Sequence, residues 1–214
     1  MRSRVLEAIR QALGRDAPAS ADDVVADYRE SIPDTPPPRQ TWDGGDAERL
    51  IERLEKASAT AERIPSAAEI PTAVARYLAE MDAVNLRIGA HPDLQGLTWP
   101  SSWEVAEGPA DAADAQVSVT RAFAAVAETG SLVMPSSPQR PTSLNFLPDI
   151  HVVVLREGEI VDYMEAVWPK LLAETGQLPR AVNFITGPSR TADVEQTLQL
   201  GAHGPRRLHV LLVT

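Results

Sequence analysis

Apolar positions at the start of the chain recur at helical spacing and are followed by a glycine. They are Val5, Leu6, Ile9 and Leu13. We therefore expect a short amphipathic helix over residues 1–13 that ends at Gly14. The following residues up to 45 are polar and acidic, with a proline cluster before position 39, which is typical of a stiff linker. Residues 1–45 are thus predicted to be an arm, and 46–214 to be the folded domain.

Beyond the arm, helical and strand-like patterns of apolar residues alternate. We expect helices over residues 46–64, 71–81, 121–127, 162–176 and 187–200. We expect strands over residues 83–88, 116–119, 131–134, 151–155, 160–161, 181–186 and 208–214, and a loop over 135–148. Parallel strands need crossover helices, and these helices cover both faces of the sheet. The alternation therefore predicts an α/β fold with a mostly parallel sheet covered by helices, together with an N-terminal helical arm.

Composition narrows the function classes. The 214 residues include 20 Lys and Arg against 30 Asp and Glu, a net charge of −10, and no cysteine. The negative charge disfavours nucleic acid and anionic membrane surfaces as partners. Without a thiolate the chain has no cysteine nucleophile, disulfide, thiolate zinc site or self-ligated iron–sulfur cluster, so any such cofactor must belong to a partner. We expect this chain to bind no cofactor itself. With no visible export signal and no apolar run long enough to span a membrane, we expect a cytoplasmic protein.

Common phosphate-binding and hydrolase motifs are absent from the chain: G-x-G-x-x-G, G-x-x-x-x-G-K-[ST] and G-x-S-x-G do not occur. Asp149 and His151 are two apart on an expected strand and would face the same way, which suggests a metal or proton-transfer site. The alternative is that His151 is a hydrogen-bonded residue at the rim of the sheet.

A first candidate segment lies where the expected helix 121–127 gives way to a strand. Glu128, Thr129 and Ser131 surround Gly130 and would place a carboxylate and two hydroxyls at a strand terminus. The macrodipole disfavours an anion at a helix C-terminus, so Glu128 suggests a role beyond helix stability. The same Glu-Thr-Gly sequence recurs at 174–176 as an ordinary helix end, so the tripeptide alone is weak evidence.

A second candidate segment begins at Gly187, where a strand breaks and a helix is expected to start. Free N–H groups beside Arg190 would form an anion site there. The alternative is a well-capped helix in which Arg190 pairs with Asp193 or Glu195. Further along, the turn that holds His203 would return toward the same edge of the sheet.

Five segments stand out together: AETGSLV at 127–133, R-x-x-S at 140–143, LPDIHVVV at 147–154, ITGPSRTADVEQTL at 185–198 and GAHGPRRLHVLLV at 201–213. In this order they resemble the lactate-utilisation protein C (LutC/YkgG) family, whose core is the LUD domain. The resemblance implies a NagB/RpiA/CoA-transferase-like fold for residues 46–214. It also implies a cluster-free subunit in a system that oxidises L-lactate to pyruvate, with iron–sulfur clusters on cysteine-rich partner subunits.

Two alternatives remain beside that interpretation. Glu128-Thr129-Gly130 is similar to the Glu-x-Gly turn that supplies the nucleophile of CoA transferases, which would make the chain an acyl- or CoA-transferring enzyme. The other alternative is a non-catalytic assembly subunit, with the N-terminal arm forming a homo-oligomer or docking partners.

Both candidate segments predict one cleft at an edge of the sheet that binds a small anion. Glu128 and His203 are the expected proton-transferring residues. The expected substrate-binding residues are Thr129, Ser131, Arg140, Ser143, Gly187, Ser189, Arg190 and Thr191.

Overall fold

A computed structural model describes residues 2–14, 38–79, 81, 85–88, 94–107, 115–137, 142–192, 198–200 and 203–214. The chain divides into two compact units, Met1–Thr41 and Trp42–Thr214. Within the described residues, no helix has the length and apolar character needed to cross a membrane.

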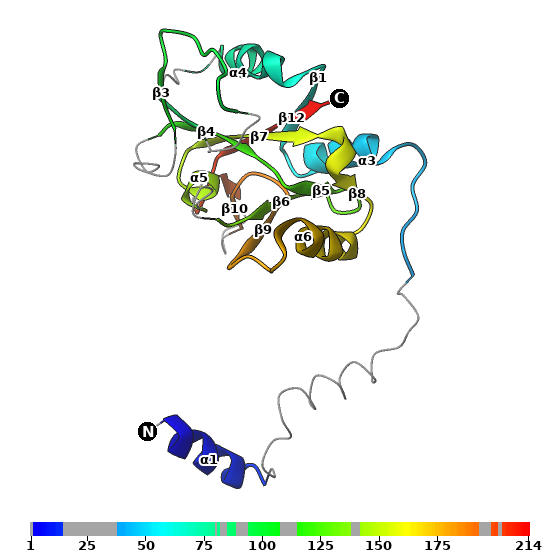
Figure 1. The fold of residues 1–214 in the computed structure, drawn as a ribbon, viewed down its shortest axis with the longest axis vertical. Coiled ribbons are helices and arrows are strands. Elements are labelled where there is room, and N and C mark those ends of the chain that lie inside the picture. The colour runs from blue at the N-terminus through cyan, green and yellow to red at the C-terminus, as the bar shows by residue number, and fades with distance from the viewer. Residues whose placement is uncertain are drawn as a thin grey trace. The chain divides into compact units, whose positions relative to one another are not determined.

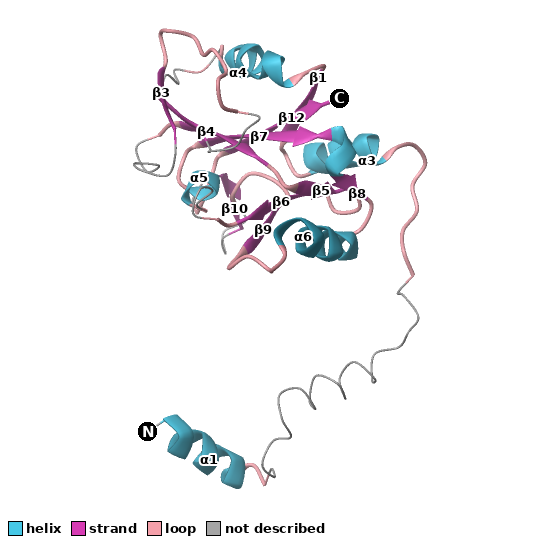
Figure 2. Ribbon diagram, viewed as in Figure 1, coloured by secondary structure: helices cyan, strands magenta, loops and turns pink. Residues whose placement is uncertain are grey.

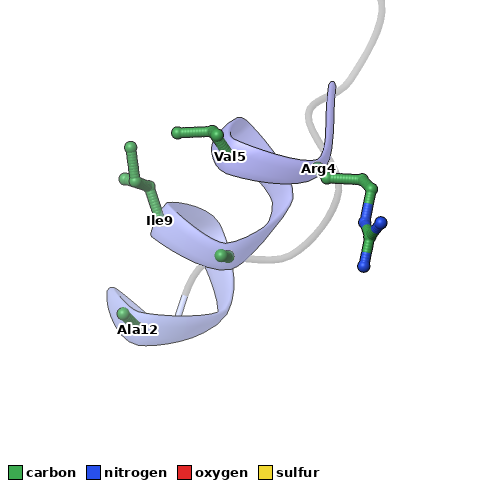
Figure 3. A pocket seen from close by; sticks show the side chains of 5 residues that line it. Arg4, Val5, Ile9 and Ala12 are labelled. Carbon is green, nitrogen blue, oxygen red and sulfur yellow. The ribbon is translucent and has the colours of Figure 1, made fainter. Parts of the chain in front are cut away.

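The first unit contains helix α1, Arg2–Ala12, as the helical spacing predicted. Gly14 adopts a left-handed φ of 60° after the helix, a conformation that glycine tolerates without steric cost. Val5 and Ile9 are about half exposed, at 55% and 49%, and project from the same side of α1, away from Arg4 (Figure 3). Residues 15–37 of the predicted linker lie outside the described residues.

The second unit is built on a six-stranded sheet in which every pairing is parallel. Its strand order is β1-β12-β7-β4-β2-β3 (Figure 1). The strands are β1 (Thr60–Ile64), β2 (Asn85–Ile88), β3 (Glu104–Glu107), β4 (Val117–Arg121), β7 (Ile150–Arg156) and β12 (Arg207–Val213). The predicted α/β fold with a parallel sheet is therefore confirmed.

Two smaller sheets accompany the parallel sheet. Four strands lie in the order β8-β5-β6-β9: β8 (Ile160–Val161), β5 (Ala124–Val126), β6 (Ser131–Pro135) and β9 (Val182–Ile185). In this sheet β5 pairs antiparallel with β6 and parallel with β8, whereas β6 pairs antiparallel with β9. The third sheet is an antiparallel pair of β10 (Arg190–Ala192) and β11 (Leu198–Leu200).

Helices lie around these sheets (Figure 2). The longer ones are α3 (Asp46–Lys56), α4 (Ile70–Leu78) and α6 (Val167–Thr175), with a single turn, α5 (Ser143–Phe146), and the 3-10 turns η1 (Ala67–Glu69), η2 (Glu157–Glu159) and η3 (Met164–Ala166). Helix α4 packs on one face of the parallel sheet, and α3 with the four-stranded sheet packs on the other. Helix α6 covers the far face of the four-stranded sheet through Val167.

The alternation of side chains along β12 explains how one strand serves both layers. Leu208, Val210 and Leu212 belong to the apolar cluster that contains α3. Leu211 lies in the cluster on the α4 side, and His209 stacks on Tyr77 of α4 at 4.0 Å between ring centroids. Successive side chains of a strand point to opposite faces, so both faces of the parallel sheet are buried.

The predicted helix over 46–64 is wrong in its second half. Helix α3 ends at Lys56, Ser58 takes a left-handed φ of 64°, and residues 60–64 form β1. Ala61 and Ile64 fit the helical face of α3 by spacing, but they lie in a strand that pairs with β12 about 150 residues away. Tertiary pairing therefore overrides the local pattern.

Two further predicted helices are also wrong. Residues 121–127 hold the end of β4, β5 and the start of a turn, and the described part of 187–200 contains β10 and β11. Their alanine and polar content suits a helix, but Ala124, Ala125 and Val126 are fully buried in the four-stranded sheet.

Smaller corrections concern the connections. The strand expected first, of which 85–88 is described as β2, is preceded by β1. The loop expected over 135–148 includes the turn α5, and β8 pairs in parallel with β5. The helix expected over 162–176 forms as η3 and α6 and ends on Gly176, which has a left-handed φ of 72°.

Candidate functional site

A cavity of about 310 Å³ opens at the amino edge of the parallel sheet. Leu208 and His151 are the second residues of β12 and β7, and they are paired in register. The other lining residues come from α5, from β9 with the loop that follows it, and from the turn before β12. They are Asn145, Phe146, Phe184, Ile185, Thr186, Gly187, Ser189, Arg190, His203, Gly204 and Pro205.

His151 forms the buried wall of this cavity. Its side chain is 0% exposed, and its Nε2 lies 2.7 Å from Thr120 Oγ1. Burial lowers the pKa of His151 to about 3, so the imidazole is neutral near pH 7. It therefore offers hydrogen bonding at the wall without a charge.

Two buried polar atoms lack partners near this wall. Among the described residues, His151 Nδ1 and Ser118 Oγ have no hydrogen-bonding partner. Ser118 is the register partner of His151 on the neighbouring strand β4, so the two side chains lie side by side on one face. Unsatisfied buried polar atoms are costly and uncommon, so this pair next to a cavity is suited to a bound water or ligand group.

The two motif loops recognised in the sequence are joined at the cavity. The Ser189 N–H donates to the Pro205 carbonyl at 2.8 Å. The His203 N–H donates to Ser189 Oγ at 3.4 Å, and a Cβ added to Gly204 would lie 3.2 Å from Ser189 Cβ. These contacts hold Ser189 and His203 in fixed relation at the cavity wall.

Gly187 anchors the first loop against α3. A Cβ at this position would lie 2.7 Å from the Ala57 carbonyl oxygen, so only glycine allows the approach. The C-terminal end of α3 is thereby placed beside the loop that carries Arg190. Arg190 itself is exposed, so its guanidinium supplies positive charge at the mouth rather than in the interior.

The Glu128 segment reaches the cavity through hydroxyl groups. Thr129 Oγ1 lies 2.7 Å from Ser131 Oγ, which lies 2.9 Å from Thr186 Oγ1. Of these three residues only Thr186 lines the cavity. Glu128 is half-buried in the turn between β5 and β6, and its N–H donates to the Asp162 carbonyl at 3.0 Å.

The structure brings together part of the predicted site. Gly187, Ser189, Arg190 and His203 line one cavity, and Ser131 is hydrogen-bonded to its wall. Glu128, Thr129 and Ser143 are not among the lining residues. Arg140 and the Thr191 side chain lie outside the described part of the chain. The roles of all these residues as a site stay predictions.

Two premises of the site prediction are wrong. No helix starts at Ser189: its N–H is bonded to Pro205, and β10 begins at Arg190, so helix N–H groups are not the anion donors there. Glu128 does not sit at a helix end either, because β5 precedes its turn. Both errors follow from strands read as helices.

Asp149 and His151 do not form a joint site. Asp149 precedes β7, its side chain is 67% exposed, and its Oδ1 lies 3.4 Å from Arg206 Nε. His151 is buried in the sheet. Within the described residues, no group of three or more His, Asp or Glu side chains is placed to hold a metal.

Several lining residues were missed by the sequence reasoning. Asn145 is 7% exposed on α5, and Phe184 and Thr186 belong to β9 and its end. The strand spacing predicts His151 either as a partner of Asp149 or as a hydrogen-bonded rim residue, and neither prediction places it at a cavity wall. The available signal was the buried run of β7, in which a histidine among valines must find a polar neighbour.

Comparison with known proteins shows which family and which proteins this chain resembles. The LUD domain family matches residues 47–213. Lactate utilization protein C of Exiguobacterium sp. is 36% identical over 145 residues, 65% of this chain and 61% of that protein. YkgG of Escherichia coli K12 is 33% identical over 117 residues, 52% of this chain and 51% of that protein. An uncharacterized protein of Neisseria meningitidis serogroup B is 39% identical over 89 residues, 41% of this chain and 38% of that protein.

The matched segments thus span from 38% to 61% of the lengths of these relatives. A crystal structure of a DUF162 family protein from Deinococcus radiodurans is similar in fold, with a TM-score of 0.58 at 23% identity. The similarity covers 80% of this chain and 99% of that one. The narrower NagB/RpiA-like assignment stays a prediction.

Proposed function

The chain belongs to the LUD domain family, and from this membership we propose that it is the cluster-free component of a system that oxidises L-lactate to pyruvate. Relatives named Lactate utilization protein C support the system. In this proposal the two electrons removed from L-lactate pass to iron–sulfur clusters on cysteine-rich partner subunits, because this chain has no cysteine to hold a cluster.

The cavity at the amino edge supports a binding role for this component. Its volume of about 310 Å³ suits a small molecule, and Arg190 and the Ser189 hydroxyl can bind a carboxylate at its mouth. Neutral His151 offers its unpaired Nδ1 to an uncharged group such as the hydroxyl of a 2-hydroxy acid. The single observation that carries the proposal is this combination of a cation at the mouth with an unsatisfied neutral group at the wall.

Calorimetric titration of the full chain with L-lactate tests the ligand. Loss of a charge-assisted hydrogen bond in Arg190→Gln should weaken binding about tenfold or more. Arg180→Gln is a matched control, because Arg180 is exposed and lies outside the cavity lining. Absence of L-lactate binding at millimolar concentration, or equal weakening by both variants, would contradict the proposed ligand.

The purified chain alone should show no L-lactate dehydrogenase activity, since the proposed electron acceptors lie on other subunits. Activity should appear only when the iron–sulfur partners are reconstituted, and Arg190→Gln should lower it. Turnover by the isolated polypeptide would refute the assignment of the redox step to partners.

A further inference from the structure

A second cavity, of about 550 Å³, lies at the same amino edge of the sheet, beside β1 and α4. Its lining residues are Ser58, Thr60, Tyr77, Pro188, Arg206, Arg207 and Leu208. Leu208 lines both cavities, and Pro188 lies between Gly187 and Ser189 of the first. The start of β12 and the 187–190 loop therefore form a common wall.

The charge of this cavity is opposite to that of the chain. None of its described lining residues is acidic, and two are arginines, in a protein of net charge −10. Arg207 forms no ion pair among the described residues. Arg206 Nε lies 3.4 Å from Asp149 Oδ1, but both side chains are about two-thirds exposed. This ion pair is therefore weak, and a ligand anion can replace the Asp149 carboxylate.

Side chains behind the cavity are fixed by a buried histidine. His209 is 4% exposed, its Nδ1 lies 2.8 Å from Thr60 Oγ1, and its ring stacks on Tyr77 with an interplanar angle of 6°. The nearby carboxylate of Glu62 is paired with Arg76, so its charge is already compensated. Thr60 and Tyr77 are thus held in place before any ligand arrives.

Ser58 occupies a position that favours glycine. It is the residue in the left-handed conformation that ends α3, with its N–H bonded to the Glu55 carbonyl and the next N–H to the Leu54 carbonyl. Glycine is the usual residue at this point of such a helix end, because a side chain there is strained. A serine at this position gives up stability and places a hydroxyl on the cavity.

We propose that this second cavity binds the phosphate group of a small phosphorylated molecule. Arg206 and Arg207 both line the cavity, guanidinium groups suit the charge of a phosphate and can bind it bidentately, and the Ser58 hydroxyl offers a donor for a further oxygen. The end of α3 opposes an anion only weakly, because the carbonyls of Leu54 and Glu55 are already bonded. The volume leaves room for the organic part of the ligand beyond the phosphate.

The test is calorimetric titration of the full chain at low salt with inorganic phosphate and with glycerol 3-phosphate. Arg207→Gln should weaken both by tenfold or more, whereas the exposed control Arg180→Gln should leave them unchanged. Arg190→Gln should weaken phosphate binding far less than Arg207→Gln does, because Arg190 does not line this cavity, and this difference separates it from the L-lactate cavity. The ester should bind at least as tightly as inorganic phosphate.

Ser58→Gly provides a second variant that cannot fail by unfolding. It should raise the melting temperature, because the left-handed strain is removed, and it should weaken phosphate binding several-fold. Unchanged phosphate affinity in Arg207→Gln, or equal loss in Arg180→Gln, would overturn the proposal whatever the outcome with L-lactate.

Discussion

Substitution of Gly130 and of Gly176 by alanine provides a matched comparison. It tests how closely the turn between β5 and β6 packs on α3. Their φ angles are nearly the same, 73° and 72°. A Cβ added to Gly130 would lie 2.5 Å from Arg53 Cβ and 3.3 Å from the Leu54 nitrogen, whereas a Cβ at Gly176 would meet nothing within 4 Å. Replacing either glycine by alanine therefore has the same cost in backbone conformation. Only the alanine at position 130 has the additional cost of a steric clash.

The expected magnitudes follow from this difference. An alanine in the left-handed region costs about 1–2 kcal/mol, so Gly176→Ala should lower the free energy of unfolding by roughly that amount. Gly130→Ala should lose about 1–3 kcal/mol more, because the backbone of α3 cannot move aside as the end of a flexible side chain can. The entropy gained by removing a glycine from the unfolded chain applies to both variants and cancels in the comparison.

Urea unfolding at equilibrium, followed by circular dichroism, measures both free energies in one buffer. The m-values of the two variants should agree, so that the midpoints report stability alone. Equal destabilisation of the two variants, within about 0.5 kcal/mol, would refute the close approach of the turn to α3.

Three other perturbations test the fold. Burial lowers the pKa of His151 to about 3 and that of His209 to about 4. Below about pH 6.5 the unfolded chain therefore binds protons that the folded chain does not, and the free energy of unfolding should fall. Urea unfolding should show a loss of roughly 2 kcal/mol per histidine between pH 7 and pH 5. Glu159→Gln should cost about 2–3 kcal/mol in the same assay, because it removes a carboxylate charge that faces the nearly buried guanidinium of Arg121. Deletion of residues 1–40 should leave a cooperative thermal unfolding transition, because that segment belongs to a separate compact unit.

Each of these expectations has its own control. His151→Gln should flatten the pH dependence by the share of one histidine, and an unchanged slope would mean that His151 is not buried neutral. Glu174→Gln breaks the exposed pair with Lys170 and should change stability by less than about 1 kcal/mol. A deletion variant without a cooperative transition would show that the arm contributes to the core.

Local sequence signals correctly predicted two kinds of element. These are helices that end at a glycine and strands whose apolar residues are buried on both faces of the sheet. Helix α1 stops before Gly14, α6 stops at Gly176, and β7 and β12 are mostly apolar and buried along most of their length. These features depend on a few adjacent residues, so the sequence carries them directly.

The elements that were missed depend on distant partners. β1 is a strand because it pairs with β12, and the alanines of β5 are strand residues because β6 and β8 flank them. The pairings of β1 with β12 and of β5 with β8 lie beyond any local window, whereas the pairing of β5 with β6 is a local hairpin that the alanine content obscured. The surroundings of His151 could not be predicted for the same reason. Its position on β7 was predictable, but its hydrogen bond to Thr120 and its place at a cavity wall follow only when the order of the strands is known.

Both cavities lie at the amino edge of the parallel sheet, and this location determines which groups are available to bind an anion. At the carboxyl edge of a parallel sheet, the N-termini of the following helices supply N–H donors and positive dipole ends. Here the helix end beside the cavities is the C-terminus of α3, which carries the opposite partial charge, and the Ser189 N–H is already used. The guanidinium groups of Arg190 and Arg207 must therefore provide most of the attraction for an anion at this edge. Because both are exposed, that attraction should weaken steeply with ionic strength, unlike binding by buried backbone donors.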